Sequence, residues 1–302
     1  MNAYHLPVLP VETIDVLNIH PAGVYVDVTF GGGGHSRLIL ERLGPDGRLY
    51  VLDQDLDVIG NIPGDNRVIF IHSNFRYLKR MLRVEGVTQV DGILADIGVS
   101  SHQFDSGERG FSFRFEGDLD MRMNQGQKLT AAEVIMTYDE AEMLEMFSAL
   151  GEVRNAKSLV RTIADARSKR KIRTIEEFIH SIEPAIMGNR AKYLAQVFQA
   201  LRIEVNDELK ALEDLLYDAY DVLKPGGVAA IISFHSLEDR IVKNFFKTGN
   251  VEGKMEQDEY GHIFRPFTLI NKKPIEAGAA ELKANNRARS AKLRAAIKNG
   301  AA

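Results

Sequence analysis

Four consecutive glycines, Gly31–Gly34, separate a short apolar run from a stretch with helical character. The run Val24–Val28 suits a buried strand, apart from Asp27, and Ser36–Leu43 continues the chain as a helix. Glycines let the backbone approach a ligand closely, and the first turn of a helix presents free N–H groups. We expect this junction to cradle a ligand that contains adenosine, although a plain tight turn would use the same residues.

Two further acidic residues stand at the ends of apolar runs. Asp53 follows residues 49–52, and Asp96 follows Ile93–Ala95. Asp53 comes about twenty residues after the last glycine, where a carboxylate can accept hydrogen bonds from both hydroxyls of a ribose. A helix N-cap or a solvated turn is the alternative for Asp53. Asp55 and Asp57 are expected to cap or begin the next helix.

The glycine loop does not complete the pattern of a dinucleotide site. A G-x-G-x-x-G motif that starts at Gly31 requires glycine at position 36, where Ser36 stands. Asp27 would help to hold the cation of a nucleoside with an amino-acid tail, whereas it would repel a pyrophosphate. The loop therefore favours S-adenosylmethionine over NAD.

The elements that must position these residues alternate between strand and helix. Apolar runs at 24–28, 49–52, 68–71 and 93–95 are separated by turns and by helical stretches such as Phe75–Val84. This alternation predicts βαβ units and a parallel sheet, which binds ligands beyond the carboxyl ends of its strands. The residues expected at that edge are Asp27, Asp53, Asn74, Phe75 and Asp96.

A long, mostly helical segment interrupts the sheet after Asp96. Helical spacing is found at 130–150, 153–166, 175–186 and 194–223, and the next convincing strand is Val228–Phe234. We predict an α/β, Rossmann-like fold formed by residues 1–104 and 193–302, with a helical subdomain inserted at 105–192. The insertion begins beside the expected reaction centre and is therefore well placed to bind a substrate.

Positive charge gathers in two stretches, although the net charge is -4. Arg154–Arg173 has eight basic residues and one acid, Asp165, and the tail after Glu281 has six basic residues and no acid. A charge run is often only a solvated surface, but two basic clusters on an acidic protein favour contacts with phosphate.

Composition narrows the class of protein. The 302 residues contain no cysteine, which excludes disulfides, thiolate metal sites and cysteine nucleophiles. The first ten residues lack the charged and apolar regions of a signal peptide, and no apolar run approaches the roughly 20 residues of a membrane span. No group of His, Asp and Glu has the spacing of metal ligands, and His5 and His35 stand alone. These features predict a cytoplasmic α/β enzyme.

Several unusual blocks occur together and in a fixed order. They are HLPVL (His5–Leu9), the loop Thr29–Ser36, DGILADIGVSSHQFD (Asp91–Asp105), RGFSF (Arg109–Phe113), LDMRM (Leu119–Met123), FQALRIEVNDEL (Phe198–Leu209), SFHSLEDRIVK (Ser233–Lys243) and NRARSAKLR (Asn286–Arg294). From His5 to Arg294 the chain closely resembles the bacterial 16S ribosomal RNA cytosine-N4 methyltransferases, the RsmH (formerly MraW) family. Two small departures are Asn286, where the family often has proline, and the stretch 188–196.

The resemblance implies a class I methyltransferase fold, with the substrate recognised by the insertion. It implies methyl transfer from S-adenosylmethionine to the exocyclic N4 of one cytidine in the decoding region of 16S rRNA, in the small ribosomal subunit. No membrane partner is implied, and a homodimer stays open. The cofactor contacts that it implies are Gly33, Gly34, His35, Asp53, Phe75, Asp96 and Gln103.

The amine of cytosine is a poor nucleophile because its lone pair is delocalised into the ring. A site must therefore align the amine with the methyl donor and accept a proton. The tetrapeptide Asp96–Val99 stands where many amino-methyltransferases have Asp/Asn-Pro-Pro-aromatic, so Asp96 is the first candidate acceptor. His235 is the second, with a structural hydrogen bond as its alternative. Ser100, Ser101 and Ser236 are nearby polar residues, and the base must be single-stranded or flipped to react.

Other functions stay open at this point. They are methylation of another RNA, of a small molecule or of a protein, nucleotide-dependent oxidoreduction, and a non-catalytic ribosome assembly factor that retains a cofactor fold. The basic insertion weighs against a small-molecule or protein substrate. The incomplete dinucleotide pattern weighs against an oxidoreductase.

Overall fold

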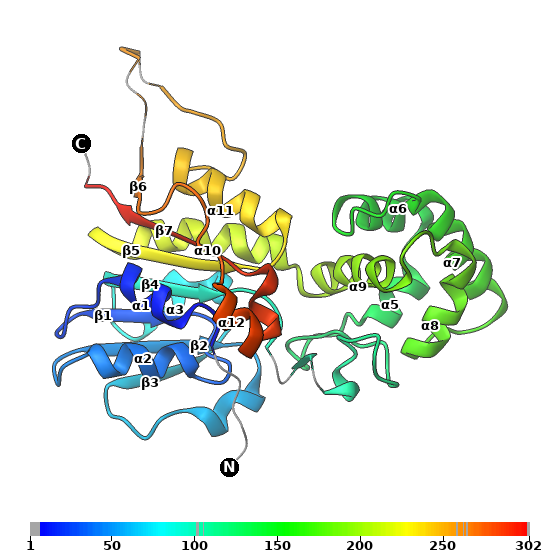
Figure 1. Cartoon of the computed structure of the whole chain (residues 1–302), viewed down its shortest axis with the longest axis horizontal. Coiled ribbons are helices and arrows are strands. Elements are labelled where there is room, and N and C mark those ends of the chain that lie inside the picture. The colour runs from blue at the N-terminus through cyan, green and yellow to red at the C-terminus, as the bar shows by residue number, and fades with distance from the viewer. Residues whose placement is uncertain are drawn as a thin grey trace. The chain divides into compact units, whose positions relative to one another are not determined.

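The computed structural model describes residues 7–100, 103, 104, 106–257, 259–261, 263 and 265–300. The chain divides into two compact units, one formed by residues 1–98 with 209–302 and the other by residues 99–208 (Figure 1). No helix in the described part of the chain is long and apolar enough to cross a membrane.

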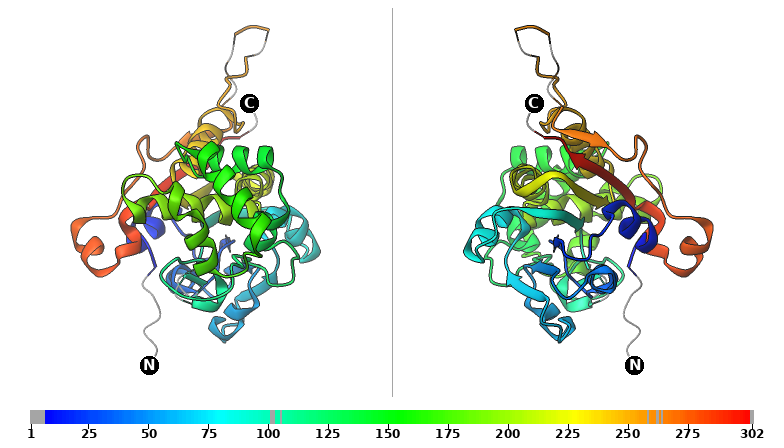
Figure 2. Two further views of the ribbon diagram at one scale, coloured as in Figure 1. Left: turned by 90° about the vertical axis from the view of Figure 1, so that its right-hand side faces the viewer. Right: turned by 90° about the vertical axis from the view of Figure 1, so that its left-hand side faces the viewer.

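The first unit is built on a seven-stranded sheet with the order β3-β2-β1-β4-β5-β7-β6. β1 to β5 are parallel, and β7 runs antiparallel to β5 on one side and to β6 on the other. β7, in red, lies beside β5, in yellow, in the right-hand view of Figure 2. The strands are β1 (Val24–Asp27), β2 (Arg48–Asp53), β3 (Val68–His72), β4 (Val90–Asp96), β5 (Leu223–Ser233), β6 (Phe267–Leu269) and β7 (Lys292–Lys298).

Helices cover both faces of this sheet, because successive strand residues point to opposite sides. In β2, Leu49 and Val51 pack in one buried cluster with α1 and α2, whereas Tyr50 and Leu52 pack in another with α3, α10 and α11. The three layers confirm the predicted α/β, Rossmann-like fold. The helices are α1 (Pro10–Leu17), α2 (Gly34–Arg42), α3 (Leu78–Val84), α10 (Glu208–Val222), α11 (Ser236–Thr248) and α12 (Ala279–Ala284), with short 3₁₀ turns η1 (Leu56–Asn61), η2 (Phe75–Tyr77) and η5 (Asn286–Ser290).

The three acidic residues singled out in the sequence end three neighbouring strands. Asp27 is the last residue of β1, Asp53 of β2 and Asp96 of β4. Asp27 pairs in register with Val51 and Leu94, so the strands end at nearly the same level. Their carboxyl ends therefore form the edge at which a parallel sheet binds ligands.

The second unit is helical and has its own apolar core. α9 contributes Leu194, Val197, Phe198 and Leu201 to this core, so the unit extends to residue 208, beyond the predicted limit at 192. The elements are α5 (Ala131–Thr137), α6 (Glu140–Ala149), α7 (Ala156–Lys169), α8 (Ile175–Ile182) and α9 (Arg190–Asn206), with 3₁₀ turns η3 (Gly107–Arg109) and η4 (Glu183–Ala185).

Local capping divides two stretches that the sequence presents as continuous helices. The stretch 130–150 breaks before Asp139, whose side chain accepts hydrogen bonds from the N–H groups of the first turn of α6. The stretch 194–223 breaks at Asp207, whose φ of +49° ends α9. The strand predicted at 228–234 begins earlier, at Leu223, and ends at Ser233. β6 and β7 are additional to the predicted elements.

Two of the unusual sequence blocks brace the second unit internally. Arg109, in RGFSF, is buried and donates to the carbonyl oxygens of Arg122 and Met123, at 3.1 and 2.9 Å. The side chain of Asn206 accepts from the N–H of Met123 and donates to the carbonyl of Met121, both at 2.8 Å. These contacts give the LDMRM block a structural role within the second unit.

Candidate functional site

The glycine loop leads from the end of β1 into the first turn of α2. Gly33 is the N-cap of α2, with a φ of +71° that favours glycine, and no side chain caps this helix end. A Cβ at Gly33 would lie 2.9 Å from the ring of Phe30, and one at Gly34 would lie 3.1 Å from Pro7. The loop is therefore a backbone cradle that a side chain at Gly33 would distort.

Asp53 is tied directly to this loop. Its Oδ2 accepts a hydrogen bond from the N–H of Gly31 at 2.8 Å, and its Oδ1 accepts one from the N–H of Asp55 at 2.9 Å. Burial raises the pKa of Asp53 to about 6. Asp55 accepts from the N–H of Asp57 at the start of η1, which confirms the predicted cap.

Asp27 stabilises the loop through hydrogen bonds of its side chain. The side chain is 2% exposed, accepts a hydrogen bond from the Ser36 hydroxyl at 2.6 Å, and accepts another from the N–H of Thr29 at 3.2 Å. Burial raises its pKa. The sequence suggested that Asp27 holds the cation of a ligand, but its burial and these bonds favour a structural role. They also explain why serine, rather than the glycine of a dinucleotide motif, stands at position 36.

Asp96 lies at the end of β4, next to the end of β5. Its N–H donates to the Thr29 hydroxyl at 2.6 Å, and its neighbour in β5 is Ile232. Its carboxylate atom Oδ1 is buried and has no hydrogen-bond partner among the described residues. Burial raises the pKa of Asp96 to about 6, although the positive charge of Arg287 opposes this shift.

His35 lies beside Asp96 in the first turn of α2. Its Nε2 is 2.8 Å from the carbonyl oxygen of Val8, and its Nδ1 is 3.8 Å from Oδ2 of Asp96. The imidazole is 6% exposed. The structure thus brings His35, Asp96, Asp53 and the glycine loop together at one edge of the sheet.

Phe75 follows the carboxyl end of β3, in η2. It is half-buried against the cluster that packs under α3 and α10, and the side chain of Asn74 caps η2 by accepting from the N–H of Arg76 at 3.0 Å. Asn74 also donates to the side chain of Gln54 at 2.8 Å. These bonds fix the turn that places Phe75 after the strand.

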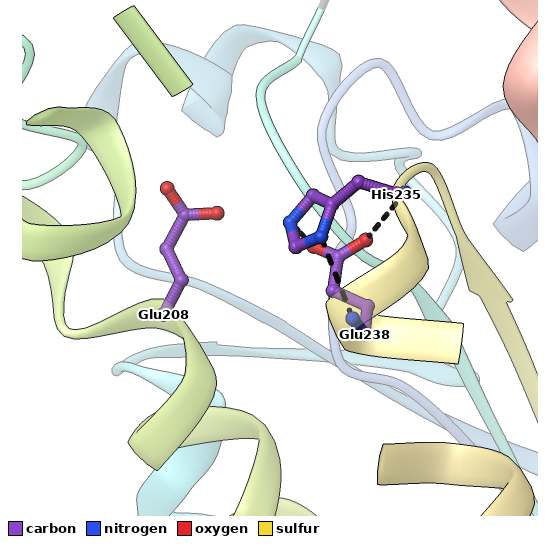
Figure 3. Close-up of side chains that lie close together, drawn as sticks. All are labelled: Glu208, His235 and Glu238. Carbon is purple, nitrogen blue, oxygen red and sulfur yellow. Dashed lines mark hydrogen bonds and ion pairs between the residues drawn. The ribbon is translucent and has the colours of Figure 1, made fainter. Parts of the chain in front are cut away.

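His235 begins α11 as its N-cap (Figure 3). Its Nδ1 accepts from the N–H of Glu238 at 3.4 Å, and its Nε2 is 3.0 Å from Oε1 of Glu238. Oε2 of Glu238 accepts in turn from the N–H groups of Phe234 and His235. The bond at Nδ1 caps α11, which favours the structural alternative for His235, while Nε2 lies close to Glu238 without a hydrogen-bond partner among the described residues.

Two charged residues near the edge were missed as site residues in the sequence. Glu238 is 1% exposed and acts on the pKa of Asp96, and Arg287 of η5 acts on it with opposite sign. The spacing of His235 and Glu238 is that of a capping box, which was the available signal for Glu238. Arg287 was visible only as one cation of the basic tail.

The other candidates lie in the second unit or outside the described residues. Gln103 is buried there, and its side-chain oxygen accepts from the N–H of Ser100 at 3.0 Å. Glu208, also drawn in Figure 3, forms an ion pair with Arg202 of the same unit at 2.8 Å. His5, Ser101 and Asp105 lie outside the described residues.

The sequence matches a family of known proteins over nearly its whole length. A model of the MraW methylase family matches residues 2–299. The chain is 55% identical over 296 residues to proteins named "Ribosomal RNA small subunit methyltransferase H" from Phocaeicola vulgatus and Bacteroides thetaiotaomicron, covering 98% of this chain and 97% of theirs. A protein of that name from Parabacteroides distasonis is 52% identical over 299 residues, covering 98% of each chain. The chain belongs to the MraW methylase family.

Proposed function

We propose that this chain transfers a methyl group from S-adenosylmethionine to the exocyclic N4 of a cytidine in the decoding region of 16S rRNA. The substrate would be the small ribosomal subunit, in the cytoplasm. The observation that carries the proposal is the full-length identity of 52–55% with relatives named as methyltransferases of small-subunit ribosomal RNA. The arrangement of acids and glycines at the edge of the sheet supports it.

The residues at this edge are compatible with S-adenosylmethionine. Gly33 keeps the loop in a backbone conformation that a side chain would distort, and we assign the carboxylate of Asp53, which holds the loop at Gly31, to the ribose hydroxyls. Gly34, the backbone of His35, Phe75, Asp96 and Gln103 complete the set of proposed contacts. The cofactor supplies a methyl group activated by the positive charge on its sulfur.

Asp96 is the residue that we assign to the amine of the cytidine. Its unpartnered Oδ1 can accept a hydrogen bond from the amine, orient it, and take its proton as the new bond forms. His235 is a weaker candidate, because its Nδ1 already caps α11.

The proposal is tested by product identification. Small ribosomal subunits from a strain that lacks the corresponding gene would be incubated with the protein and labelled S-adenosylmethionine, and the rRNA digested for nucleoside mass spectrometry. N4-methylcytidine is expected. Cofactor binding without any methylated product would instead support the assembly factor, label in another nucleoside would redirect the site of transfer, and binding of NAD in preference would support an oxidoreductase.

The described structure sorts the basic residues of the second unit into two groups. Arg167 donates to the carbonyls of Ile135 and Tyr138, Lys169 pairs with Asp165, and Arg170 donates to Ser181. These cations serve the unit itself. Arg154, just before α7, and Lys157 and Arg161, within it, are exposed.

We call these three residues the α7 stripe. Lys157 and Arg161 are four residues apart, which places them on one face of α7, and Arg154 lies two residues before the helix begins. Cations with this arrangement suit successive phosphates of an RNA backbone. The basic tail contributes less than its composition suggested. Arg294 is paired with Asp239 at 2.7 Å, and Lys298 donates to the carbonyls of Tyr220 and Leu223.

Replacing Arg154, Lys157 and Arg161 together by alanine is expected to weaken binding to small-subunit RNA at least about tenfold. The slope of log K against log salt should also fall, by about 0.7 for each lost contact with single-stranded RNA. Filter binding at several salt concentrations measures both quantities, and calorimetry should show unchanged affinity for S-adenosylmethionine.

The matched control replaces Lys169, Arg190 and Lys210 by alanine. These three are equally exposed cations, but each is already paired with an acid. The control should alter neither RNA affinity nor the salt slope. Equal losses in the two triple variants would show that only net charge matters and would contradict a role for the α7 stripe.

A further inference from the structure

The side chain of His35 is fixed in one tautomer by the backbone. A carbonyl oxygen only accepts hydrogen bonds, so Nε2, which lies 2.8 Å from the oxygen of Val8, must carry a hydrogen. In the neutral imidazole Nδ1 then has a free lone pair. Because the ring is buried, it is held in this orientation.

That lone pair faces an acid. Nδ1 lies 3.8 Å from Oδ2 of Asp96, within the range of an ion pair. When His35 is neutral and Asp96 is ionised, two acceptors face each other without a hydrogen between them. The two atoms are too far apart for a hydrogen bond, so a proton taken up at Nδ1 forms an ion pair with the carboxylate.

The other charged groups around Asp96 are less able to receive that proton. Asp27 accepts hydrogen bonds from Ser36 and Thr29. Glu238 accepts at Oε2 from the N–H groups of Phe234 and His235, and its Oε1 faces Nε2 of His235 at 3.0 Å. Arg287 is cationic and favours the ionised carboxylate. Together with His35 from α2, these residues, Asp27 from β1, Glu238 from α11 and Arg287 from η5, act on the charge of Asp96.

We propose that His35 is a positioning residue that shares, through Asp96, the proton released by the methylated amine. This inference rests on the proposed function, because the proton comes from the exocyclic amine of the cytidine. It concerns the imidazole side chain and is separate from any contact of the loop backbone with the cofactor.

Methyl transfer to N4 forms one bond and breaks another. The lone pair of N4 forms the bond to the methyl carbon while the bond between that carbon and the donor sulfur breaks, leaving its electron pair on sulfur. The amine nitrogen, now positively charged, gives one proton to a carboxylate oxygen of Asp96. The proton then moves from Asp96 to Nδ1 of His35, which yields an imidazolium paired with a carboxylate, and it passes to solvent after the product leaves.

The test compares His35→Gln with the matched control His72→Gln. A glutamine amide can still donate to the Val8 carbonyl but has no basic nitrogen. His72 also places Nε2 near a backbone carbonyl, that of Gln54 at 3.1 Å, and lies at the end of neighbouring β3. The readout is the pH dependence of single-turnover methyl transfer to small subunits, with cofactor affinity and melting temperature measured alongside.

We expect His35→Gln to lower the plateau rate about tenfold and to move the acidic limb of the profile to lower pH by about half a unit or more. The pair of His35 and Asp96 takes up its first proton at a higher pH than Asp96 alone, so removal of the imidazole moves the acidic limb to lower pH. Cofactor affinity should stay within about threefold, and His72→Gln should match the unmodified protein throughout.

If His35→Gln is less stable than the unmodified protein, a second measurement still tests the proposal. In the Asp96→Asn background, His35→Gln should have no further effect on the rate, because the two residues act as one unit. The inference would be overturned if the acidic limb of the pH profile did not move. It would also be overturned if His35→Gln lowered the rate by its full factor in the Asp96→Asn background. Absence of N4-methylcytidine with the unmodified protein would instead refute the proposed function, so the two failures are distinct.

Discussion

Replacing Asp96 by asparagine is expected to lower the single-turnover rate of methyl transfer about a thousandfold. The amide can still accept a hydrogen bond from the amine, so it can orient the base, but it cannot take the proton. Rapid-quench measurement at saturating S-adenosylmethionine isolates this step from binding. A variant that retained a rate within fivefold of the unmodified protein would exclude Asp96 as the proton acceptor.

The same substitution is expected to stabilise the protein at neutral and alkaline pH. Burial raises the pKa of Asp96 from 3.8 to about 6, so the folded protein binds this proton more tightly than the unfolded chain. The corresponding stability is fully present below pH 3.8 and is lost as the pH rises through about 6. Asparagine carries no charge, so the variant should gain about 1–3 kcal/mol above pH 6 and nothing near pH 4.

Thermal melts at pH 4, 6 and 8 measure this difference. A higher melting temperature at pH 8 together with a lost reaction would show that the buried carboxylate is kept for chemistry at a cost in stability. If Asp96→Asn and the unmodified protein melted at equal temperatures at all three pH values, the ionised carboxylate would not be destabilising in the folded protein.

Replacing Asp53 by alanine is expected to weaken binding of S-adenosylmethionine about 10–100-fold. The change removes the proposed acceptor for the ribose hydroxyls, and it also removes the partner of the Gly31 N–H, which shapes the glycine loop. Because burial raises the pKa of Asp53 to about 6, the affinity of the unmodified protein should fall as the pH drops below that value. Titration calorimetry between pH 5 and 8 measures both effects.

The control for this experiment is Asp57→Ala. Asp57 is an exposed acid a few residues further along the same segment, at the start of η1. It should leave the affinity and its pH dependence unchanged. A comparable loss with Asp57→Ala would show that the net charge near the loop, and not the carboxylate of Asp53, governs binding.

The sheet edge was predictable because its signals are local. Alternating apolar runs locate β1 to β4, and the acids that end them lie at one edge because the strands are parallel. The glycine run marks the start of α2 directly. The position of Asp53 relative to Gly31 follows from the geometry of adjacent parallel strands.

Features that depend on distant partners were not predictable from one sequence. β7 reads as a basic, alanine-rich tail, and it is a strand because β5 and β6 pair with its two sides. The charge of Arg294 gives no sign that Asp239 lies beside it, which is why the basic tail was over-counted as an RNA surface. The role of Asp27 depended on knowing that Ser36 returns to it.

The strand order also has a consequence for biosynthesis. β4 ends at Asp96, whereas its neighbour β5 begins only at Leu223 and the next strand, β7, lies at 292–298. During translation from the N-terminus, the contiguous segment 99–208 is complete while three of the seven described strands, β5, β6 and β7, are still unmade. The helical unit can therefore fold on the translating ribosome before β5, β6 and β7 complete the sheet.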